Sequence, residues 1–383
     1  MREGWEEVDF LNSIEKTINT NKVSKKSFLV EGTYPIISQE KNLINGYWNN
    51  SNDVFEVSKA VILFGDHTKI IKYIDFDFVL GADGVKILLP KKNLESKFFY
   101  YQLKSFSIQN LGYARHYRLL KEFKIVIPPL PEQKQIVKTL DLAFKQIDQA
   151  KANIEKNIAN AKELFASKLN EVFSQRGEGW EEKKLEELSP HKNAIVSGPF
   201  GSNLKVSDYR DSGVPIIRLQ NVGKGRFIEK DIKYIEEEKA EELKSHSFVT
   251  GDIVLAKLGI PIGKTCIIPE SFSDGIILAD IVRIRPDRRI VNYNFLEYFL
   301  NTSLSVSQLT KNISGATRPR VNLSNVRSII VPLPPIIVQN DIVIKITKLE
   351  NNIITLETAY QQNLNNLEEL KKSILEKAFK GEL

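Results

Sequence analysis

Cysteine and long apolar segments are scarce in this chain of 383 residues. Cys266 is the single cysteine, which excludes an internal disulfide framework and a cysteine-based zinc site. No apolar run reaches the roughly 18 residues needed to cross a bilayer. The first residues contain no apolar signal core. We therefore expect a soluble protein of a reducing compartment, the cytoplasm, without membrane attachment.

Signatures of catalysis are scarce as well. The histidines are His67, His116, His191 and His246, and none has a second His or Cys at metal-ligand spacing. Residues 259–265 (GIPIGKT) resemble a phosphate-binding loop, but that loop needs four residues between its glycines and a following helix. Here the glycines are too close, and a strand pattern follows. We expect no catalytic residue, no metal and no cofactor in this chain.

Net charge is small for a protein of this size. The chain has 54 Lys and Arg against 48 Asp and Glu, a formal charge of +6, and 42% of its residues are hydrophobic. The apolar content indicates folded domains, and the length suggests two or three of them. The mild positive charge permits a nucleic-acid partner without requiring one.

A long internal repeat organises the sequence. Residues 128–137 (PPLPEQKQIV) recur as residues 334–343 (PPIIVQNDIV), a shift of 206 that carries Gln133 to Gln339 and Phe173 to Phe379. Near the start, residues 4–7 (GWEE) recur as residues 179–182. The order is globular, helical, globular, helical. We place the four segments at residues 1–130, 131–176, 177–335 and 336–383.

Proline runs mark where each helical segment begins, because proline suits the first turn of a helix and not its interior. The alternative is that these runs are polyproline ligands for a partner domain. Both runs stand at the same predicted strand-to-helix junction, which favours the first interpretation.

The helical segments carry a seven-residue period, which predicts a coiled coil. One position of the period is filled by Leu140, Ile147, Ile154 and Ala161 in the first segment, and by Ile346, Ile353, Tyr360, Leu367 and Ile374 in the second. Three residues later come Ala143, Ala150, Asn157 and Leu164, and correspondingly Leu349, Leu356, Asn363 and Leu370. Asn157 and Asn363 are predicted to be buried and to fix the register; the alternative is two solvated asparagines.

The globular segments have the pattern of mixed α/β domains. Apolar runs bounded by Gly, Pro and Asp predict strands at residues 60–64, 252–256 and 281–285. Aromatic runs predict corresponding helices at residues 98–103 and 295–300. Between these elements, loops combine basic and amide side chains with aromatics. Arg and Lys can pair with guanine or hold phosphate, and Asn and Gln can pair with adenine.

Taken together, the doubled segments resemble the DNA-specificity (S) subunits of type I restriction-modification systems. The resemblance covers the whole chain. It rests on the Gly-Trp openings, on the Ile/Val-Pro-x-Pro-Pro run before each helix, on Gln-x-x-Ile-Val at the helix start, and on the closing residues 370–383. The chain departs from the family pattern at residues 8–10 and at residues 337–338, where the family tends to have a Glu before the Gln.

The resemblance implies an α/β (α+β) protein with two similar target-recognition domains and two long helices that form an antiparallel, pseudo-two-fold symmetric coiled coil. It implies a non-catalytic subunit in which each domain reads one half of a bipartite duplex DNA site. Two methyltransferase subunits and the restriction (motor-nuclease) subunits would be its partners. S-adenosylmethionine, ATP and Mg would belong to those partners and not to this chain.

The side chains expected to contact DNA lie in loops of both domains. In the first domain they are Ser38, Gln39, His67, Lys69, Arg115, His116 and Arg118. In the second domain they are Ser202, Asn203, Lys205, Arg218, Gln220, Asn221, Lys257, Lys264, Thr317, Arg318 and Arg320.

Two other functions remain open from the sequence. The modest charge and the prominent coil would also suit a coiled-coil adaptor that joins proteins and ignores DNA. A nuclease or ATPase function would rest only on the imperfect phosphate loop at residues 259–265.

Overall fold

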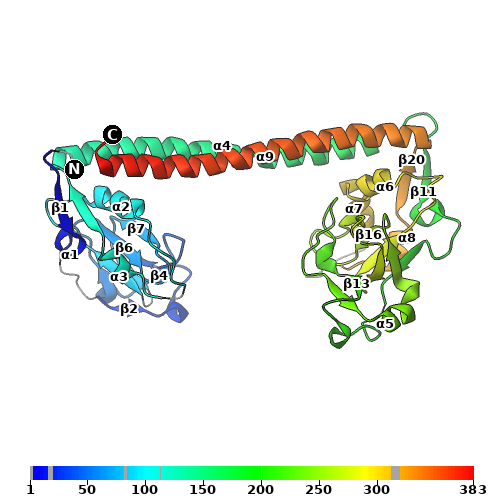
Figure 1. Ribbon diagram of the computed structural model, residues 1–383, viewed down its shortest axis with the longest axis horizontal. Coiled ribbons are helices and arrows are strands. Elements are labelled where there is room, and N and C mark those ends of the chain that lie inside the picture. Colours follow the sequence, from blue (N-terminus) through cyan, green and yellow to red (C-terminus); the bar gives the residue numbers. More distant parts are fainter. Residues whose placement is uncertain (1–2, 16–19, 82–83, 113, 200, 312–319) are drawn as a thin grey trace. The chain divides into compact units, whose positions relative to one another are not determined.

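Two units make up the computed structural model, which describes residues 3–15, 20–81, 84–112, 114–199, 201–311 and 320–383 (Figure 1). The first lobe consists of residues 1–156 and 360–383, and the second lobe consists of residues 157–359. Each lobe therefore contains one globular part and one end of each of two long helices.

The long helices are α4 (Leu130–Ser174) and α9 (Ile336–Lys380), each of 45 residues. The sequence-based segments were 131–176 and 336–383. Both helices begin directly after a Pro-Pro pair, and Pro131 occupies the first turn of α4, where its missing N–H costs no helical hydrogen bond.

Ion pairs show that the two helices run antiparallel within each lobe. In the first lobe Lys371 Nζ lies 3.0 Å from Asp148 Oδ1, and Lys151 pairs with Glu368. In the second lobe Lys162 Nζ lies 3.6 Å from Glu357 Oε2. As the residue number rises along α4, its partner's number falls along α9. The helices thus pair as an antiparallel coiled coil inside each lobe.

The prediction that two buried asparagines fix the register of the coiled coil is wrong. Asn157 and Asn363 are both exposed, and so are Leu164, Leu356 and Leu370. In each heptad the second position that faces the other helix lies four residues, not three, after the first. Ile158 thus follows Ile154, and Leu364 follows Tyr360. Several of these inward positions carry charged residues, and their stems cover the seam while their heads pair across it. The first series of the predicted period is buried or half-buried as expected, for example at Leu140, Ile147 and Ile346, and the predicted phase of the second series is wrong.

Strands in the first lobe form three sheets among the described residues. Strand β1 (Glu6–Asp9) pairs antiparallel with β10 (Lys124–Ile127). The second sheet has the order β7-β6-β9, with bounds Ile71–Ile74, Val61–Gly65 and Val85–Leu88. The third has the order β2-β8-β3-β4, with β5 also on β8, and its bounds are Lys22–Val23, Phe78–Gly81, Tyr34–Ile37, Gly46–Trp48 and Val54–Phe55.

The second lobe repeats this plan. Strand β11 (Glu181–Lys184) pairs antiparallel with β20 (Ile330–Leu333). One sheet has the order β12-β19-β16-β17, with bounds Ile195–Ser197, Ile281–Ile284, Ile253–Ala256 and Thr265–Ile267. The other has the order β14-β13-β18-β15, with bounds Lys233–Ile235, Val214–Ile217, Asp274–Ile277 and Ser247–Val249. In both lobes the central pair, β3 with β8 and β13 with β18, is parallel.

Short helices complete the lobes. The first has α1 (Phe10–Ser13), α2 (Ser96–Ser105), α3 (Tyr117–Leu120) and the 3₁₀ turns η1 (Lys25–Ser27) and η2 (Ser51–Asp53). The second has α5 (Glu237–Glu242), α6 (Tyr293–Leu300), α7 (Ser303–Thr310), α8 (Leu323–Arg327) and the 3₁₀ turns η3 (Leu185–Leu188), η4 (Val206–Asp208), η5 (Leu219–Asn221) and η6 (Lys244–His246). The predicted strands at 60–64, 252–256 and 281–285 and helices at 98–103 and 295–300 are confirmed as β6, β16, β19, α2 and α6.

A buried glutamine joins each globular part to its long helix. Gln133 Nε2 donates to the carbonyls of Asn93 (2.9 Å) and Pro128 (2.7 Å), while its Oε1 accepts from Glu95 N (2.7 Å). Gln339 repeats the arrangement with Ile290 O (3.0 Å), Pro334 O (2.8 Å) and Asn292 N (2.8 Å). Both side chains are fully buried. In each amide the oxygen accepts one hydrogen bond and the nitrogen donates two, as buried polar groups require.

Aromatic packing attaches the end of the other helix. In the first lobe Phe98 of α2 meets Phe379 of α9, with ring centroids 5.1 Å apart. In the second lobe Phe295 and Phe299 of α6 meet Phe173 of α4, at 5.1 and 5.5 Å. Phe173 and Phe379, which the 206-residue repeat matches to each other, therefore make equivalent contacts. None of the described helices is both long and apolar enough to span a membrane.

Candidate nucleic-acid interface

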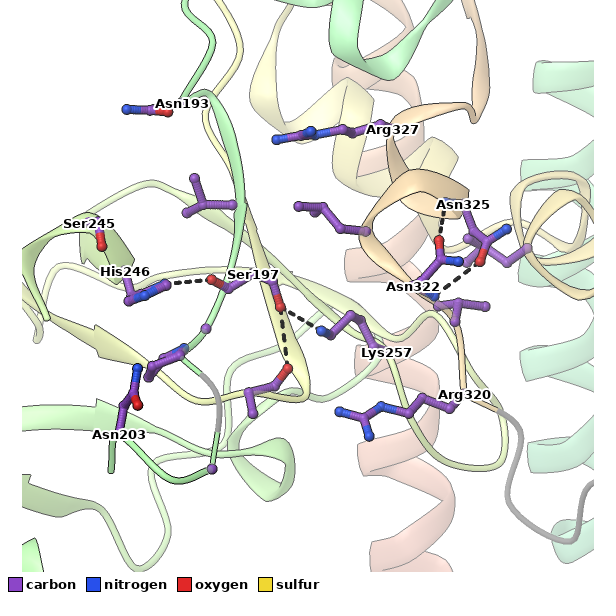
Figure 2. Close-up of a pocket in the computed structure, with 18 residues that line it drawn as sticks. Asn193, Ser197, Asn203, Ser245, His246, Lys257, Arg320, Asn322, Asn325 and Arg327 are labelled. Atoms are coloured by element: carbon purple, nitrogen blue, oxygen red, sulfur yellow. Dashed lines mark hydrogen bonds between the residues drawn. The ribbon is translucent and has the colours of Figure 1, made fainter. Parts of the chain in front are cut away.

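A cleft of about 1290 Å³ lies in the second lobe (Figure 2). It is bordered by the end of β12, the segment after β16, the turn η6 and the helix α8. Its polar side chains are Asn193, Ser197, Asn203, Ser245, His246, Lys257, Arg320, Asn322, Asn325 and Arg327.

Ser197 lies at the centre of this cleft, between His246 and Lys257 (Figure 2). Lys257 Nζ donates to Ser197 Oγ at 2.5 Å, and His246 Nδ1 lies 2.7 Å from the Ser197 carbonyl oxygen. Lys257 is only 7% exposed. Burial, followed by the nearby Arg320, lowers the pKa of its ammonium group. The cleft wall therefore holds a cation that water solvates poorly, which favours an anionic or electron-rich ligand.

The glycine after Ser197 is required by close packing. A Cβ on Gly198 would lie 2.1 Å from the carbonyl oxygen of Leu278. Gly198 N instead donates to Ile281 O at 3.0 Å, so the chain leaving β12 stays against the turn between β18 and β19. Gly198 thus serves backbone packing along the cleft.

Arginine and amide groups line the opposite wall. Arg320 Nη2 pairs with Asp280 Oδ1 at 2.8 Å, and more than half of its side chain remains exposed. Asn322 and Asn325 cap α8 reciprocally: each side-chain oxygen accepts from the other residue's backbone N–H, at 2.8 and 3.0 Å. Within the described part of the chain their amide NH₂ groups have no hydrogen-bond partner. The wall can therefore offer both cationic and neutral donors.

Three of the residues predicted from sequence meet in this cleft, namely Asn203, Lys257 and Arg320. Ser202 and Lys205 are exposed on the segment that adjoins it, together with Asn203. Lys264 lies directly before β17 and does not line the cleft. Thr317 and Arg318 lie outside the described residues. The hairpin between β16 and β17 also accounts for the phosphate-loop resemblance, since a strand follows it.

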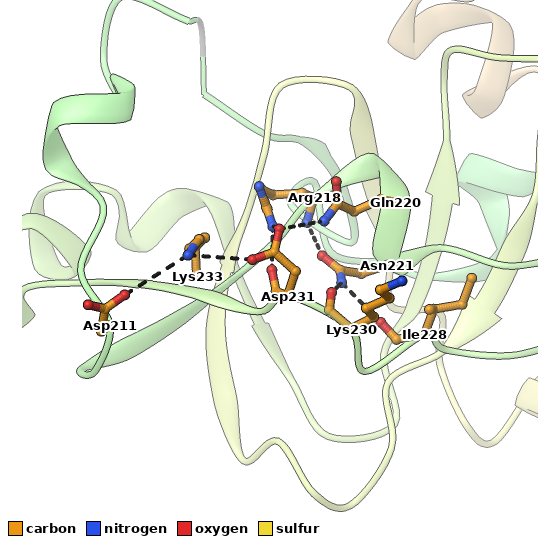
Figure 3. A network of polar contacts seen from close by, with 8 residues as sticks. All are labelled: Asp211, Arg218, Gln220, Asn221, Ile228, Lys230, Asp231 and Lys233. Atoms are coloured by element: carbon orange, nitrogen blue, oxygen red, sulfur yellow. Dashed lines mark hydrogen bonds and ion pairs between the residues drawn. The ribbon is translucent and has the colours of Figure 1, made fainter. Parts of the chain in front are cut away.

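A separate network holds the other predicted residues of this lobe (Figure 3). Arg218 Nη2 donates to Asp231 Oδ2 at 2.7 Å, and Gln220 Nε2 donates to the same oxygen at 3.2 Å. Lys233 Nζ lies 3.4 Å from Asp231 Oδ1. These contacts, Arg218 first, lower the pKa of the Asp231 carboxyl to about 2. The charge of Arg218 is thus neutralised within the protein.

Asn221 is fully buried beneath this network. Its Oδ1 accepts from Arg218 N, and its Nδ2 donates to the carbonyls of Ile228 and Lys230, each at 3.0 Å (Figure 3). Because its amide oxygen and both amide hydrogens are paired and the side chain is fully buried, the prediction that Asn221 contacts DNA is wrong for this structure. It is a turn-forming residue.

His116 in the first lobe has a comparable structural role. It is fully buried. Its Nε2 accepts from Leu111 N at 3.1 Å, so its Nδ1 carries the proton and donates to Asp66 O at 2.9 Å. Arg115 and Arg118 on either side are exposed. The prediction of DNA contact is therefore wrong for His116, which holds in place the segment that carries Arg115 and, in α3, Arg118.

The remaining predicted residues of the first lobe lie on the loop after β3 and the turn after β6. Gln39 Oε1 accepts from His67 N at 3.2 Å, and both side chains are partly exposed. Lys69 has a left-handed backbone, with φ 59°. Ser38 is buried, and its Oγ lies 2.9 Å from Asn45 Oδ1. The prediction for Ser38 is wrong, because its hydroxyl is used inside the loop.

Sequence reasoning missed several residues of the cleft. His246, Asn322 and Asn325 were not selected, and neither was Arg327, whose Nη2 donates to Ile195 O at 2.8 Å. The Asn-x-x-Asn spacing is a helix-cap signal that could have placed the two asparagines at a loop–helix junction. The described residues contain no group of three or more His, Cys, Asp or Glu side chains able to hold a metal ion.

Comparison with known families decides what kind of protein carries this cleft. The family model for the type I restriction modification DNA specificity domain matches twice, at residues 2–160 and 177–366. The chain belongs to this family. It is a sequence-specific DNA-recognition subunit of a type I restriction-modification system, and the DNA and the other subunits of such a system are its partners.

Relatives across the specificity family agree with this assignment. The chain is 25% identical over 367 residues to the EcoBI specificity subunit of Escherichia coli, covering 88% of this chain and 75% of that protein. It is 25% identical over 430 residues to the EcoKI specificity subunit of E. coli K12, covering 100% and 89%.

Solved structures show the same fold. One, concerned with complex assembly and conformational transition of the type I R-M system, matches with a TM-score of 0.72 at 18% identity, over 100% of this chain and 99% of that chain. The HsdS subunit from Thermoanaerobacter tengcongensis matches with a TM-score of 0.53 at 17% identity, over 100% and 98%.

Proposed function

We propose that each lobe of this specificity subunit reads one half of a bipartite duplex DNA site and that the paired helices set the distance between the halves. The observation that carries the proposal is the presence of two specificity domains in one chain, at residues 2–160 and 177–366. Two readers in one polypeptide suit a target made of two different half-sites.

The cleft of the second lobe has the chemistry for such reading. Lys257 and Arg320 are cations suited to guanine edges or to phosphate oxygens, and Asn203, Asn322 and Asn325 carry amides suited to adenine. In the first lobe the exposed candidates are Arg115 and Arg118, with Gln39, His67 and Lys69 on the neighbouring loops. Different side chains in the two lobes would read different bases.

The helices supply the spacing in this proposal. A helix of 45 residues is about 68 Å long at about 1.5 Å per residue. One turn of DNA is about 34–36 Å long. Two readers mounted on the ends of one continuous helix pair could therefore contact half-sites more than one DNA turn apart.

Partner subunits would supply the chemistry. We propose that two methyltransferase subunits dock on the helices and bring S-adenosylmethionine, and that restriction subunits add ATP- and Mg-dependent translocation and cleavage in the cytoplasm. Docking is supported by aliphatic side chains exposed along both helices, such as Leu142, Ile344 and Ile354, since exposed apolar surface of this kind marks protein interfaces. This chain would contribute no catalytic group.

The first test selects bound DNA from random duplexes with the purified complex of this chain and its methyltransferase. The proposal expects a split consensus with a fixed gap. Enrichment of one uninterrupted sequence would contradict the two-reader mechanism, and no enrichment would favour a coiled-coil adaptor.

The second test shortens the helices. Residues 152–158 and 361–367 lie between the ion pairs Lys151–Glu368 and Lys162–Glu357. Deleting both heptads preserves the seven-residue phase and shortens each helix by about 10 Å, or about three base pairs. The selected gap should shorten by about that amount. An unchanged gap would remove the helices from the spacing mechanism.

A further inference from the structure

A second groove, rich in positive charge, lies beside the cleft in the second lobe. Its volume is about 770 Å³. The cationic side chains that line it are Lys192, Lys244, Arg283, Arg285, Arg288 and Arg289, and among the described residues the acidic side chain that lines it is Asp287. We call it the basic groove.

Charge in the basic groove is only partly neutralised. Asp287 is engaged by Arg289, with Nη2 2.6 Å from Oδ2, and Arg285 is engaged by the buried Asp252. Lys192 has no ionic partner among the described residues, and Arg288 lies over the ring of Tyr293, 4.3 Å from its centroid. The groove therefore keeps a positive surplus on accessible side chains.

The floor of the groove adds a buried cation. Arg283 is 5% exposed, and it donates through Nη1 to Ser247 O at 2.8 Å and through Nη2 to Asn193 O. Its Nε has no partner, and no carboxylate pairs with it in the described part of the lobe. Burial and the neighbouring Arg285 lower the pKa of this guanidinium. A buried cation held only by carbonyls raises the electrostatic potential of the space above it.

The basic groove continues from the candidate base-reading cleft. Asn193 and Ser245 line both concavities, and Figure 2 shows them at the side of the cleft away from Asn322 and Asn325. A duplex read at the cleft carries phosphates on either side of the base edges that are read, and the shared edge brings the groove next to such phosphates. No exposed large aliphatic side chain lines the groove, whereas protein interfaces are built around an apolar centre.

A matching pair of basic residues stands in the first lobe. Arg288 and Arg289 directly precede Ile290, whose carbonyl Gln339 holds. Lys91 and Lys92 directly precede Asn93, whose carbonyl Gln133 holds, and both lysines are exposed. Reading loops differ between the lobes, but this dibasic pair does not. The sugar-phosphate backbone is the part of a DNA target that is the same in both half-sites, and its charged groups are the phosphates.

From these observations we propose that the basic groove binds backbone phosphates of duplex DNA flanking the half-site read by the second lobe. The proposal rests on the proposed DNA-reading function and deepens it. The groove would add affinity and orientation without base identity, because phosphate contacts carry no sequence information. Lys192 and Arg288, which are exposed and pair with no carboxylate among the described residues, would make direct contacts.

The test measures the salt dependence of binding with the full chain in its methyltransferase complex. The probe is a random-sequence duplex of about four helical turns, roughly 40 base pairs. Each phosphate contact contributes about 0.9 to the slope of log affinity against log salt. The double variant Lys192→Gln, Arg288→Gln should therefore lower the slope by about 1.8 and reduce affinity at low salt. The double variant Lys183→Gln, Lys184→Gln, which removes equal charge from β11 outside both concavities, should retain the slope.

Outcomes separate the possibilities. Support requires the smaller slope together with an unchanged ranking of preferred sequences and unchanged content of methyltransferase. A wild-type slope in the groove variant would overturn the proposal. So would loss of the methyltransferase with no change in slope, which would assign the groove to an acidic protein surface. If the wild-type complex ranks no sequence above another, the DNA-reading function fails, and the slope still reports on the groove.

Discussion

The two lobes attach to the helices by the same contacts but expose different loops. Gln133 and Gln339 make three equivalent hydrogen bonds each. Tyr101 and Tyr298 donate to carboxylates of the adjacent long helix, Asp141 and Glu350. In both lobes a long helix packs against a small domain in the same way, so the same contacts are found in both.

The exposed loops of the two lobes differ in structure. In the second lobe the loops leave an open cleft with Lys257 at its wall. In the first lobe the segment that carries Arg115 and, in α3, Arg118 is held by the hydrogen bonds of the buried His116. We therefore expect the attachment residues to contribute similarly to the stability of the two lobes. Each loop residue, in contrast, should affect either the stability of its own lobe or the binding of DNA.

The largest effect should come from the aromatic attachment. Phe173 is fully buried between Phe295 and Phe299, so Phe173→Ala should cost about 3–5 kcal/mol of unfolding free energy. Phe379 makes the equivalent contact but is only half-buried, and Phe379→Ala should cost roughly 2 kcal/mol. Denaturant unfolding followed by lobe-resolved hydrogen exchange measures both. A larger loss at Phe379 would break the proposed equivalence.

The glutamine attachment should come next. Gln339→Leu leaves Asn292 N and two carbonyls without their partner, and Gln133→Leu does the same to Glu95 N. Each should lose roughly 2–3 kcal/mol, detected as faster hydrogen exchange in the lobe concerned. The control is Gln362→Leu, an exposed glutamine on α9, which should change stability little. Unequal losses at the two buried glutamines would show that the lobes are attached differently.

Loop residues should sharpen the contrast between lobes. Lys257→Met removes a buried charge from the cleft and should leave thermal stability unchanged or raised, while weakening DNA binding roughly tenfold through one lost contact of about 1.4 kcal/mol. His116→Ala should instead lower the stability of the first lobe by about 1–3 kcal/mol. Thermal unfolding and DNA titration of both variants check this. A His116 variant with full stability would contradict its structural role.

The last effect depends on pH and is confined to the second lobe. Burial, followed by the nearby Glu350, raises the pKa of Glu297 from 4.5 to about 7. The folded state then holds a proton that the unfolded state releases between these values, so stability falls as pH rises from 4.5 to about 7. Glu297→Gln should be more stable than wild type above this window and similar below it. The exposed control Glu238→Gln should show no such window in a melting series; if Glu297→Gln also shows none, the buried carboxyl does not contribute.

Much of the fold could be predicted from the sequence because its strongest signals, the proline pairs and the long repeat, follow directly from backbone geometry and packing. The Pro-Pro pairs locate the helix starts, and the 206-residue repeat correctly matches Gln133 with Gln339 and Phe173 with Phe379. The seam of the coiled coil could be predicted only in part. Its inward positions include Lys151, Glu357 and Lys371, whose charges are paired across the helices, and a search for apolar residues passes over them.

The site could be predicted less well than the fold. Residue type selected Lys257 and Arg320, which line the cleft, but could not separate them from Asn221 and His116. Polar groups of loops can serve a DNA contact or the loop's own backbone equally well. Burial decides between these roles, and burial depends on contacts distant in sequence, such as that of His116 with Asp66. The basic groove escaped notice for the same reason, since its cations come from three separated segments.

The central claim is that attachment is shared and reading is separate, and a domain exchange tests it most directly. Residues 1–129 would be replaced by the corresponding domain of another specificity subunit, with α4 and its Gln133 retained. Methyladenine would then be mapped by single-molecule sequencing of DNA from cells carrying the chimera and its methyltransferase. The account predicts that one half-site changes while the other half-site and the gap stay the same. A change in both half-sites, or in neither, would contradict it.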